Sequence, residues 1–586
     1  MRVDGSLAAG AAFAHAAQMR LSAVFLFVLL FVLLLTGCAT GRVPQPAPVS
    51  PRIIVEPDER PGFWRATYEL TAPASELRFE RTPFRTGVFE VLTPGFAIAH
   101  EGDTEVLRTA GAPSARIVVR FPEFTRELEK EYDFFQKFTD GSIAIYTGHL
   151  AAIQSGNAEE AIRRFHFVPP TGHHVVAGGT VVNGPADWID RDGDGAYIYI
   201  GAIQPIETDD LISIVDPGLP PWLWEETRNA LPRVFKTYTR RLGISPSERP
   251  LVLFNYTDGG GSGYSSGGGV LPGQIQLRAD GAAWKERSDE AFLHLFRFLA
   301  HEAAHLWNGR IIRYSGAEDA WMHEGSADAL TDRMLLELGL VDDAGYLELQ
   351  TQALNDCRRQ LGSFPLRDAS QRKAFHLYYS CGNSLALFTE NAVANRDLFA
   401  FWKTLIARVR SAGRTEFDPA DYFAAMSAAG ASPRDVERLR AFVEQSATAE
   451  ALVEMLRAGG VRLAEAAPSE RFGQSIARDA LFRILGEQCT GPYGFTVVES
   501  GFSVTKSDAC GPLSGGGIVT AIGGHHVLRD GSGAGTVLHE RCGSGIPLPI
   551  DLIVDGVTKR VEVDCRKPFA APPEFLKIEA ARITSR

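Results

Sequence analysis

Two histidines and a glutamate form the pattern His301-Glu302-x-x-His305, and Glu324 follows after eighteen intervening residues. On a helix, side chains four residues apart lie on one face. His301 and His305 can therefore bind one zinc ion while Glu302 serves as a base. Glu324, from a second helix, would be the third ligand and would leave one coordination position for water. Catalytic zinc sites have this open arrangement, so the pattern predicts metal-assisted hydrolysis with one Zn²⁺ per chain.

The residues around this pattern predict the helix that it needs. Ser288 is a suitable N-cap, Asp289 and Glu290 suit the first turn, and Gly309 is the expected stop. Apolar residues recur between them at helical spacing: Phe292, Leu295, Leu299, Ala303 and Leu306. The alternative is an accidental match, since H-E-x-x-H alone arises by chance in roughly a few per cent of chains of this length. Glu324, which follows the motif after eighteen residues, favours the zinc interpretation over an accidental match.

The whole chain has the composition of a globular protein with several domains. It has 586 residues, of which 45% are hydrophobic and 22% charged, and about three domains are expected. A net charge of -12 argues against nucleic acid as a general partner. The glycine-rich loop at 259–269 lacks the Lys-Ser/Thr of a phosphate-binding loop, so no nucleotide is expected either.

The N-terminus looks like an export signal. A strongly apolar run of fifteen residues, Leu21 to Leu35, is short for a membrane span and suits a secretory signal. The run Leu35-Thr36-Gly37-Cys38 resembles the lipobox of bacterial lipoproteins, which implies that Cys38 is lipidated and begins the mature chain. An uncleaved transmembrane anchor is the alternative. Both interpretations put the rest of the chain outside the cytoplasm, and the first predicts a lipid-anchored protein of the bacterial cell envelope facing the periplasm or the exterior.

The remaining cysteines agree with an exported protein. An even number in such a chain indicates disulfides, although six cysteines allow fifteen connectivities. Proximity in the sequence favours three pairs: Cys357 with Cys381, Cys489 with Cys510, and Cys542 with Cys565. No C-x-x-C spacing is present, so a cysteine zinc site or a thiol redox motif is not expected.

Three domains follow the predicted signal peptide at 1–38 and a proline-rich tether at 39–60. Residues 61–205 alternate in short runs broken by turns, which predicts an all-β domain. Within it, Asp190 to Gly195 matches the start of a calcium loop, but Gly201 stands at its twelfth position, so a hairpin turn is favoured. Residues 206–470 read as mixed α/β and then helical, with a strand expected from Val270 to Leu277.

The last region, 471–586, returns to strands. The segments Gly516 to Gly524, Ile550 to Gly556 and Val561 to Val563 resemble the later strands of a PDZ domain, a fold that binds extended peptides at a sheet edge. A small β domain that merely packs on the enzyme is the alternative. The chain as a whole is therefore predicted to be a multidomain α+β protein.

The central motifs resemble a known group of enzymes. Trp307 lies two residues after the second histidine, and the run Trp321-x-x-Glu324-Gly325 follows, as in gluzincin metallopeptidases of the membrane alanyl and glycyl aminopeptidase families. The resemblance covers about the central 260 residues. It implies a thermolysin-like domain that hydrolyses peptide bonds. The domain order, β domain, then metallopeptidase, then PDZ-like domain, resembles the glycyl aminopeptidase family more than the membrane alanyl aminopeptidase family.

Roles for further residues follow from this resemblance. Zinc lowers the pKa of bound water from 15.7 towards about 7, and Glu302 would pass the proton on to the leaving amine. The families supply an oxyanion donor from a Tyr-x-Lys-Gly run, and Tyr379-Ser380-Cys381-Gly382 fits it, so Tyr379 is favoured over Tyr378. Cys381 replaces the lysine, and a bond to Cys357 would brace the segment. Asp328 lies one turn beyond Glu324 and either orients a ligand histidine or is simply solvated.

One stretch departs from the family pattern. The aminopeptidases carry a Gly-x-Met-Glu-Asn strand whose glutamate holds the substrate's amine. The corresponding substrate strand here contains Gly269, Val270, Gly273 and Gln274, and it has no carboxylate. Strict aminopeptidase action is therefore not implied. The predicted partners are a peptide or protein substrate and, through the lipid, a membrane. The alternative function is a non-catalytic peptide-binding or scaffold lipoprotein that keeps the metallopeptidase fold.

Overall fold

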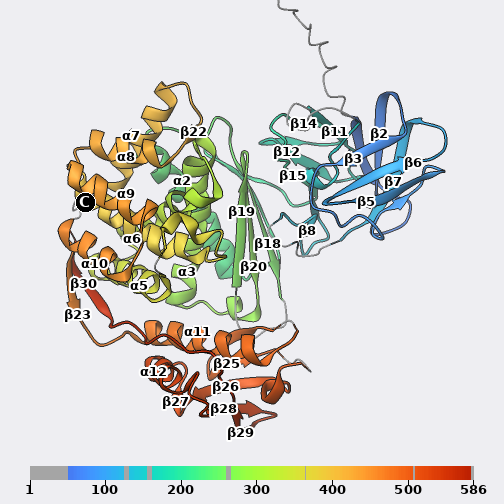
Figure 1. Cartoon of the computed structure of the whole chain (residues 1–586). Helices are drawn as coiled ribbons and strands as arrows, with labels where there is room; N and C mark the ends of the chain where they lie inside the picture. Colours follow the sequence, from blue (N-terminus) through green and yellow to red (C-terminus); the bar gives the residue numbers. More distant parts are fainter. Residues whose placement is uncertain are drawn as a thin grey trace, which may run out of the picture.

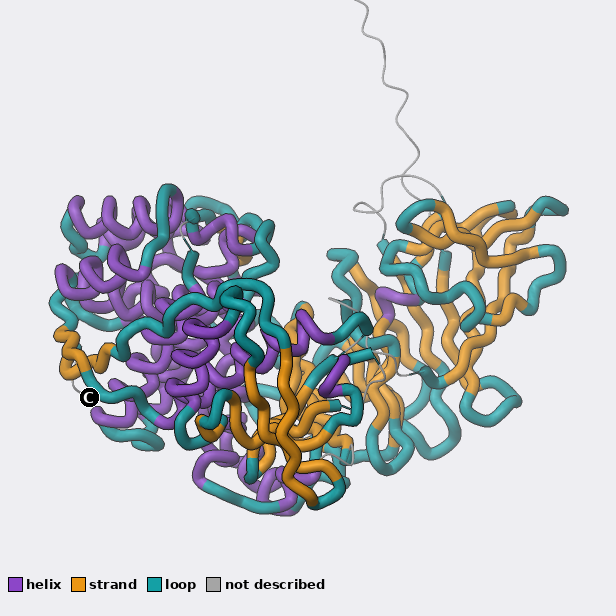
Figure 2. Tube along the Cα trace, turned by 60° about the horizontal axis from the view of Figure 1, so that its bottom comes forward, coloured by secondary structure: helices purple, strands orange, loops and turns teal. Residues whose placement is uncertain are grey.

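The computed structural model describes residues 51–581 apart from 125–127, 129–130, 155–161, 259–264, 363, 492 and 506–508. In Figure 1 the N-terminal strands, blue to teal, lie to one side of the central helices, and the C-terminal strands, orange to red, lie below them. Figure 2 shows the same division between strand-rich and helix-rich regions. The multidomain mixed α/β architecture is thus confirmed. The predicted signal peptide and Cys38 lie outside the described residues.

The described strands of the N-terminal region form three sheets. One has the order β14 (Ala186–Asp190), β11 (Arg163–Phe167), β1 (Arg52–Pro57), β2 (Phe63–Ala74), β7 (Ser114–Pro122) and β4 (Glu90–Val91). Another has the order β10 (Ala152–Ile153), β3 (Glu76–Phe79), β6 (Thr104–Thr109) and β5 (Phe96–Glu101). The third has the order β13 (Thr180–Val182), β12 (His174–Ala177), β15 (Tyr197–Gly201), β9 (Ile143–Tyr146) and β8 (Phe135–Lys137).

The first strand corrects the extent of the predicted tether. Residues 52–57 form β1, which pairs with β11 on one side and β2 on the other. Ile53 and Val55 are fully buried, as alternate positions of a strand with one face on the core should be. The proline content of 39–60 concealed this short apolar run, whose proline, Pro57, stands at the strand's end.

The turn from Asp190 to Gly195 is also not the expected hairpin. β14, before it, pairs with β11, whereas β15, after it, pairs with β12 and β9 in another sheet. The Asp190 carboxylate accepts backbone hydrogen bonds from Asp192, Gly193 and Gly195 at 3.2, 2.8 and 3.2 Å. An aspartate that binds the backbone ahead of it stabilises a turn. Local chemistry therefore gives a turn, while packing decides that it links two sheets.

The central region begins with a mixed sheet of order β16 (Ile206–Glu207), β17 (Ile212–Val215), β18 (Leu251–Thr257), β20 (Gln274–Asp280) and β19 (Ser265–Leu271). β19 is antiparallel to β20 and lies at the edge. The helices are α2 (Pro221–Leu242), α3 (Asp289–His305), α4 (Ser326–Glu337), α5 (Asp343–Gln360), α6 (His376–Ala392), α7 (Leu398–Ser411), α8 (Pro419–Ala428), α9 (Pro433–Glu444) and α10 (Ala449–Ala458). A small parallel pair joins β21 (Arg313–Tyr314) to β22 (Glu416–Phe417).

The strand expected from Val270 to Leu277 is two strands. Pro272 and Gly273 form the turn between β19 and β20, and Gly273 has a φ of 65°. Glycine adopts such a left-handed conformation at little cost, and proline has no N–H for a central strand. The Pro-Gly pair was thus a turn signal inside an apolar run.

The C-terminal region contains α11 (Glu470–Gln488), α12 (Gly531–Arg541) and a sheet of order β24 (Phe495–Val498), β25 (Gly501–Val504), β26 (Gly517–Ile522), β28 (Leu548–Val554) and β29 (Val557–Val563), with β27 (His525–His526) beside β26. Its last strand, β30 (Leu576–Ala580), returns to pair with β23 (Arg462–Glu465). Asn355 of α5 donates to the Leu576 carbonyl at 2.7 Å and accepts from the Leu576 N–H at 3.0 Å. The end of the predicted 471–586 domain is therefore bound to the central region.

Three disulfides join the six cysteines in the pairs that sequence proximity favours: Cys357–Cys381, Cys489–Cys510 and Cys542–Cys565. The first links α5 to α6, and both of its cysteines are fully buried. Among the described residues, no helix combines the length and the apolar character that a membrane span requires. The resemblance of the C-terminal sheet to a PDZ domain stays a prediction.

Candidate metal centre

The helix α3 carries both histidines on one face of its last turn, and His305 is its final residue. Ser288 caps it by accepting a hydrogen bond from the Ala291 N–H, as the sequence predicts. The helical path does not stop at Gly309, because a π-helical segment continues through Leu306–Ile311. Gly309 has another purpose: a Cβ there would lie 2.5 Å from the His323 ring. The glycine lets the chain pass close to the segment that carries Glu324.

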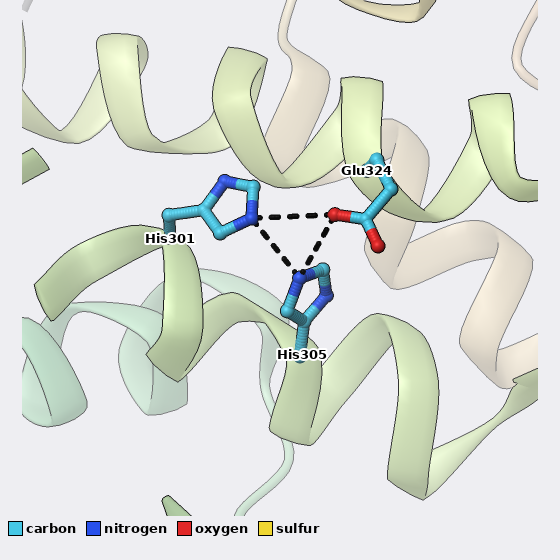
Figure 3. A group of neighbouring side chains, drawn as sticks. All are labelled: His301, His305 and Glu324. Carbon is cyan, nitrogen blue, oxygen red and sulfur yellow. Dashed lines mark hydrogen bonds and ion pairs between the residues drawn. The ribbon is translucent and has the colours of Figure 1, made fainter. Parts of the chain in front are cut away.

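Three ligand atoms converge between these two segments (Figure 3). The His301 and His305 Nε2 atoms lie 3.1 Å apart, and Glu324 Oε2 lies 3.4 Å from the first and 3.3 Å from the second. Tetrahedral zinc with ligand bonds of about 2.0–2.1 Å has ligand–ligand edges of about 3.3 Å. His301, His305 and Glu324 are the group of possible ligands found among the described residues. Their atom types and spacing fit zinc.

Each histidine is oriented by a partner on its other nitrogen. His301 Nδ1 donates to Asp328 Oδ1 at 2.9 Å, and His305 Nδ1 donates to Asn308 Oδ1 at 3.1 Å. Such partners fix the tautomer that leaves Nε2 free to bind a metal. The structure therefore places Asp328 where an orienting carboxylate belongs rather than in solvent. Asn308 was missed, although its position three residues after His305 on the same helix could have indicated it.

Glu302 lies against the edge strand β19. A Cβ added at Gly268 of β19 would lie 2.9 Å from the Glu302 carboxyl carbon. Burial raises the pKa of Glu302, while the neighbouring His301 and His305 lower it. The net pKa is raised, which suits a carboxylate that must both take and return a proton.

The two candidate tyrosines have separate environments. The Tyr379 ring stacks on the His301 ring, with centroids 5.9 Å apart and planes at 17°. Tyr379 as a whole is 40% exposed, but loss of water around its hydroxyl, followed by the charge of Glu324 and a hydrogen bond to it, raises the pKa of Tyr379 and keeps the hydroxyl a proton donor. Tyr378 is buried elsewhere: its hydroxyl donates to the Arg367 carbonyl at 3.1 Å and accepts from the Ser370 N–H at 3.0 Å. The structure thus brings Tyr379, not Tyr378, to the ligands.

A crossing of two glycines lets Tyr379 approach. A Cβ added at Gly325 would lie 2.2 Å from the Gly382 Cα, and one added at Gly382 would lie 2.5 Å from the Trp321 carbonyl oxygen. α6 therefore crosses the segment Trp321–Gly325 in backbone contact, directly after Glu324 and three residues after Tyr379. Neither glycine needs a positive φ here, so close approach is the reason for both.

The predicted substrate strand is only partly at the site. Gly269 and Val270 lie on β19, but Gly273 lies in the turn and Gln274 begins β20. The Gln274 amide accepts from the Tyr197 N–H at 2.8 Å and donates to the Tyr197 carbonyl at 2.7 Å. Because both of its polar atoms bind the N-terminal region, Gln274 is not a substrate contact, which corrects the prediction.

Two residues that the sequence did not single out bind the same carbonyl of β19. Tyr132, from the N-terminal region, donates its hydroxyl to Val270 O at 3.2 Å. Arg310, five residues after His305, also donates to Val270 O and pairs with Asp194 at 3.0 Å. The N-terminal region therefore holds the strand that borders the metal centre. No local pattern in the sequence marks Tyr132, since its partner is 138 residues away.

No family model matches this chain, and no curated protein matches it. Among solved structures, an aminopeptidase N family protein from Idiomarina loihiensis is similar to it, with 13% sequence identity and a TM-score of 0.59 over 90% of this chain and 98% of that chain. The likeness shows a shared fold.

Two further similar structures are M1 zinc metallopeptidase variants. One is a two-domain protein bound to L-arginine, with 15% identity and a TM-score of 0.40 over 69% of this chain and 95% of that chain. The other, from Deinococcus radiodurans, is bound to a Tyr-Ser-Ala substrate, with 15% identity and a TM-score of 0.42 over 68% of this chain and 95% of that chain. At these TM-scores the two likenesses carry no weight of their own.

Proposed function

We propose that this chain is a zinc-dependent metallopeptidase that acts outside the cytoplasm. The observation that carries the proposal is the triangle of His301, His305 and Glu324, with edges of 3.1–3.4 Å, and its neighbours Glu302 and Tyr379. A bound zinc ion supplies a Lewis acid that polarises the peptide carbonyl and lowers the pKa of water. The shared fold with an aminopeptidase N family protein supports the same class of enzyme.

The chain's own residues perform the proton transfers. Glu302 accepts a proton from the attacking water and delivers it to the leaving amine. The Tyr379 hydroxyl donates a hydrogen bond to the oxyanion that forms at the peptide carbonyl. Asp328 and Asn308 hold the two histidine rings, so that little reorganisation accompanies the reaction.

We further propose that Cys38 anchors the protein to a bacterial membrane by a lipid and that residues 471–586 form a PDZ-like domain. The Leu-Thr-Gly-Cys run and the three disulfides support an extracytoplasmic location, where disulfides persist. Mass spectrometry of the membrane-extracted protein is expected to find acylated Cys38 as its first residue. A chain that begins upstream of Cys38 without acyl groups would contradict the anchor and leave the peptidase proposal intact.

Glu302→Gln tests the enzymatic function. The wild type is expected to bind about one zinc per chain and to cut peptides, whereas the variant keeps its zinc and loses cleavage, because an amide cannot accept the proton. Zinc analysis and peptide cleavage followed by mass spectrometry provide the two readouts. Equal cleavage by the variant would exclude this mechanism, and metal-free wild-type protein would favour the non-catalytic scaffold.

The same cleavage assay tests whether the enzyme requires a free amino terminus on its peptide substrate. Because Gly269 and Val270 on β19 provide no carboxylate, we propose that cleavage does not depend on an amino terminus. Acetylated and unblocked versions of each peptide are expected to be cut at comparable rates. Cleavage confined to the first residue of unblocked peptides would overturn this part of the proposal.

A further inference from the structure

A buried carboxylate outside the metal centre gathers side chains from three neighbouring helices. Asp332, on α4, has a fully buried side chain. Its Oδ1 lies 3.0 Å from Arg297 Nη2 of α3. Its Oδ2 accepts hydrogen bonds from Gln350 of α5 and Asn383 of α6, each at 3.0 Å. One carboxylate thus connects four helices.

Three members of this group stand one helical turn from residues of the site. Arg297 precedes His301 by four residues, Asp332 follows Asp328 by four, and Asn383 follows Tyr379 by four. Residues four apart lie one above the other on the same helix face. The group therefore forms a second layer beneath the metal centre, in the same register on all three helices.

Electrostatics give this layer a fixed geometry. Burial raises the pKa of Asp332, and the Arg297 charge opposes that rise. The same guanidinium interacts with Asp328, the partner of His301. An ion pair with two further hydrogen bonds strongly disfavours displacement, because a shifted helix would leave a buried charge unpaired.

We propose that Asp332 is a positioning residue for the peptidase reaction: with Arg297, Gln350 and Asn383 it sets the register of α3, α4 and α6. Two parts of the site depend on this register. On α4 and α3 it places Asp328 against His301. On α6 it places the Tyr379 hydroxyl beside Glu324. The proposal rests on the proposed peptidase function, and it adds a role for residues that touch neither metal nor substrate.

The chain provides a matched control, a second buried ion pair between α4 and α6. Glu390 of α6 is also buried and pairs with Arg333 of α4 at 3.1 Å. It also accepts from the Leu398 N–H and the Tyr346 hydroxyl at 3.2 and 3.3 Å. Glu390 lies eleven residues beyond Tyr379, about three turns from the site. Glu390→Gln therefore removes a comparable buried charge farther along α6, where we expect it to leave Asp328 and Tyr379 in place, although its partner Arg333 directly follows Asp332 on α4.

The experiment compares Asp332→Asn, Asn383→Ala and Glu390→Gln in the full chain. Peptide cleavage gives kcat and KM, and cobalt substitution gives a visible absorption band that reports ligand geometry. Asp332→Asn is expected to lower kcat by about 10- to 100-fold, with KM changed less than about two-fold, and to shift the cobalt band. Asn383→Ala, which releases only α6, is expected to lower kcat about ten-fold with an unchanged band. Glu390→Gln is expected to keep both wild-type values.

The outcomes separate positioning from a merely structural role. Equal kcat and equal cobalt bands in Asp332→Asn and Glu390→Gln would overturn the proposal. If Asp332→Asn does not fold, Asn383→Ala decides by its kcat, because it leaves the ion pair intact. A wild type that binds cobalt and cleaves no peptide would refute the proposed function alone. The proposal on Asp332 would then stand or fall on the band shift relative to Glu390→Gln.

Discussion

Two regions of this molecule hold a glutamate close to histidine, and they use it differently. In the N-terminal region, Glu105 accepts hydrogen bonds from the backbone N–H groups of Phe84, Arg85 and Thr86 and from the Thr86 hydroxyl. It also pairs with the Arg85 guanidinium at 2.9 Å, with both side chains fully buried. At the metal centre, by contrast, Glu324 Oε2 faces two histidine nitrogens that already have partners on their other side.

The difference lies in where the lone pairs point. Donors surround Glu105, so its charge is neutralised within the protein. Arg85 also binds the His149 carbonyl at 2.9 Å and lies 4.4 Å from the Phe79 ring. At the metal centre the acceptor atoms converge on one another, which is unfavourable unless a cation lies among them. A carboxylate surrounded by donors forms a structural cluster, whereas a carboxylate that converges with other acceptors forms a candidate metal site.

The largest expected effect is the loss of stability in Glu105→Gln. Removing one charge of a buried pair leaves Arg85 uncompensated and is expected to destabilise the fold by about 3–5 kcal/mol. Zinc content and kcat of the folded protein should stay at wild-type values if the two regions are as distinct as described. Urea unfolding, zinc analysis and peptide cleavage measure the three quantities. A loss of zinc together with a normal unfolding midpoint would contradict the comparison.

The opposite result is expected at the metal centre. Tyr379→Phe removes one oxyanion donor and should lower kcat by about 10²–10³-fold, equivalent to about 2.7–4 kcal/mol, while zinc content and stability stay unchanged. Tyr378→Phe is the matched control, because the Tyr378 hydroxyl binds Arg367 and Ser370 and its loss should cost about 1 kcal/mol of stability. A greater loss of kcat in Tyr378→Phe than in Tyr379→Phe would show that Tyr379 is not the oxyanion donor.

A smaller effect is expected from pH. Burial, and then the Arg85 charge, lower the pKa of His149 from 6.5 to about 3. A group whose pKa is lowered on folding contributes stability above its unfolded pKa and loses it as the pH falls towards the folded value. At pH 5 the loss is about 2 kcal/mol relative to neutral pH. Urea unfolding of the wild type and of His149→Gln at pH 7 and pH 5 measures it: a pH dependence that is the same in both would exclude His149 as the source.

Much of the candidate site was predictable because it depends on short separations. The four-residue spacing of His301 and His305 places both rings on one face of any helix. The Ser288 cap is an equally local property. The disulfide pairs, too, joined neighbours along the chain, with separations of 24, 21 and 23 residues.

Other features could not be predicted locally. Ile53 and Val55 became a central strand because β11, more than a hundred residues later, pairs with it. β30 packs on the central region rather than on the C-terminal sheet, because the side chains of Asn355 and Thr351 on α5 form hydrogen bonds with its backbone. The structural role of Gln274 could not be recognised from its neighbours in the sequence, because its partner, the backbone of Tyr197, lies 77 residues away.

The sequence by itself determined the chemistry: which atoms can bind zinc, which carboxylate can carry a proton, and which segments form helices. These follow from residue type and from the periodicity of the backbone. Only the tertiary structure decided that Asn308 holds His305, that the Tyr379 hydroxyl binds Glu324, and that Asp332 joins the helices beneath the site. The physical reason is that the register of one helix against another depends on packing between distant segments, such as the contact of Gly325 with Gly382. The sequence of one segment alone does not specify this packing.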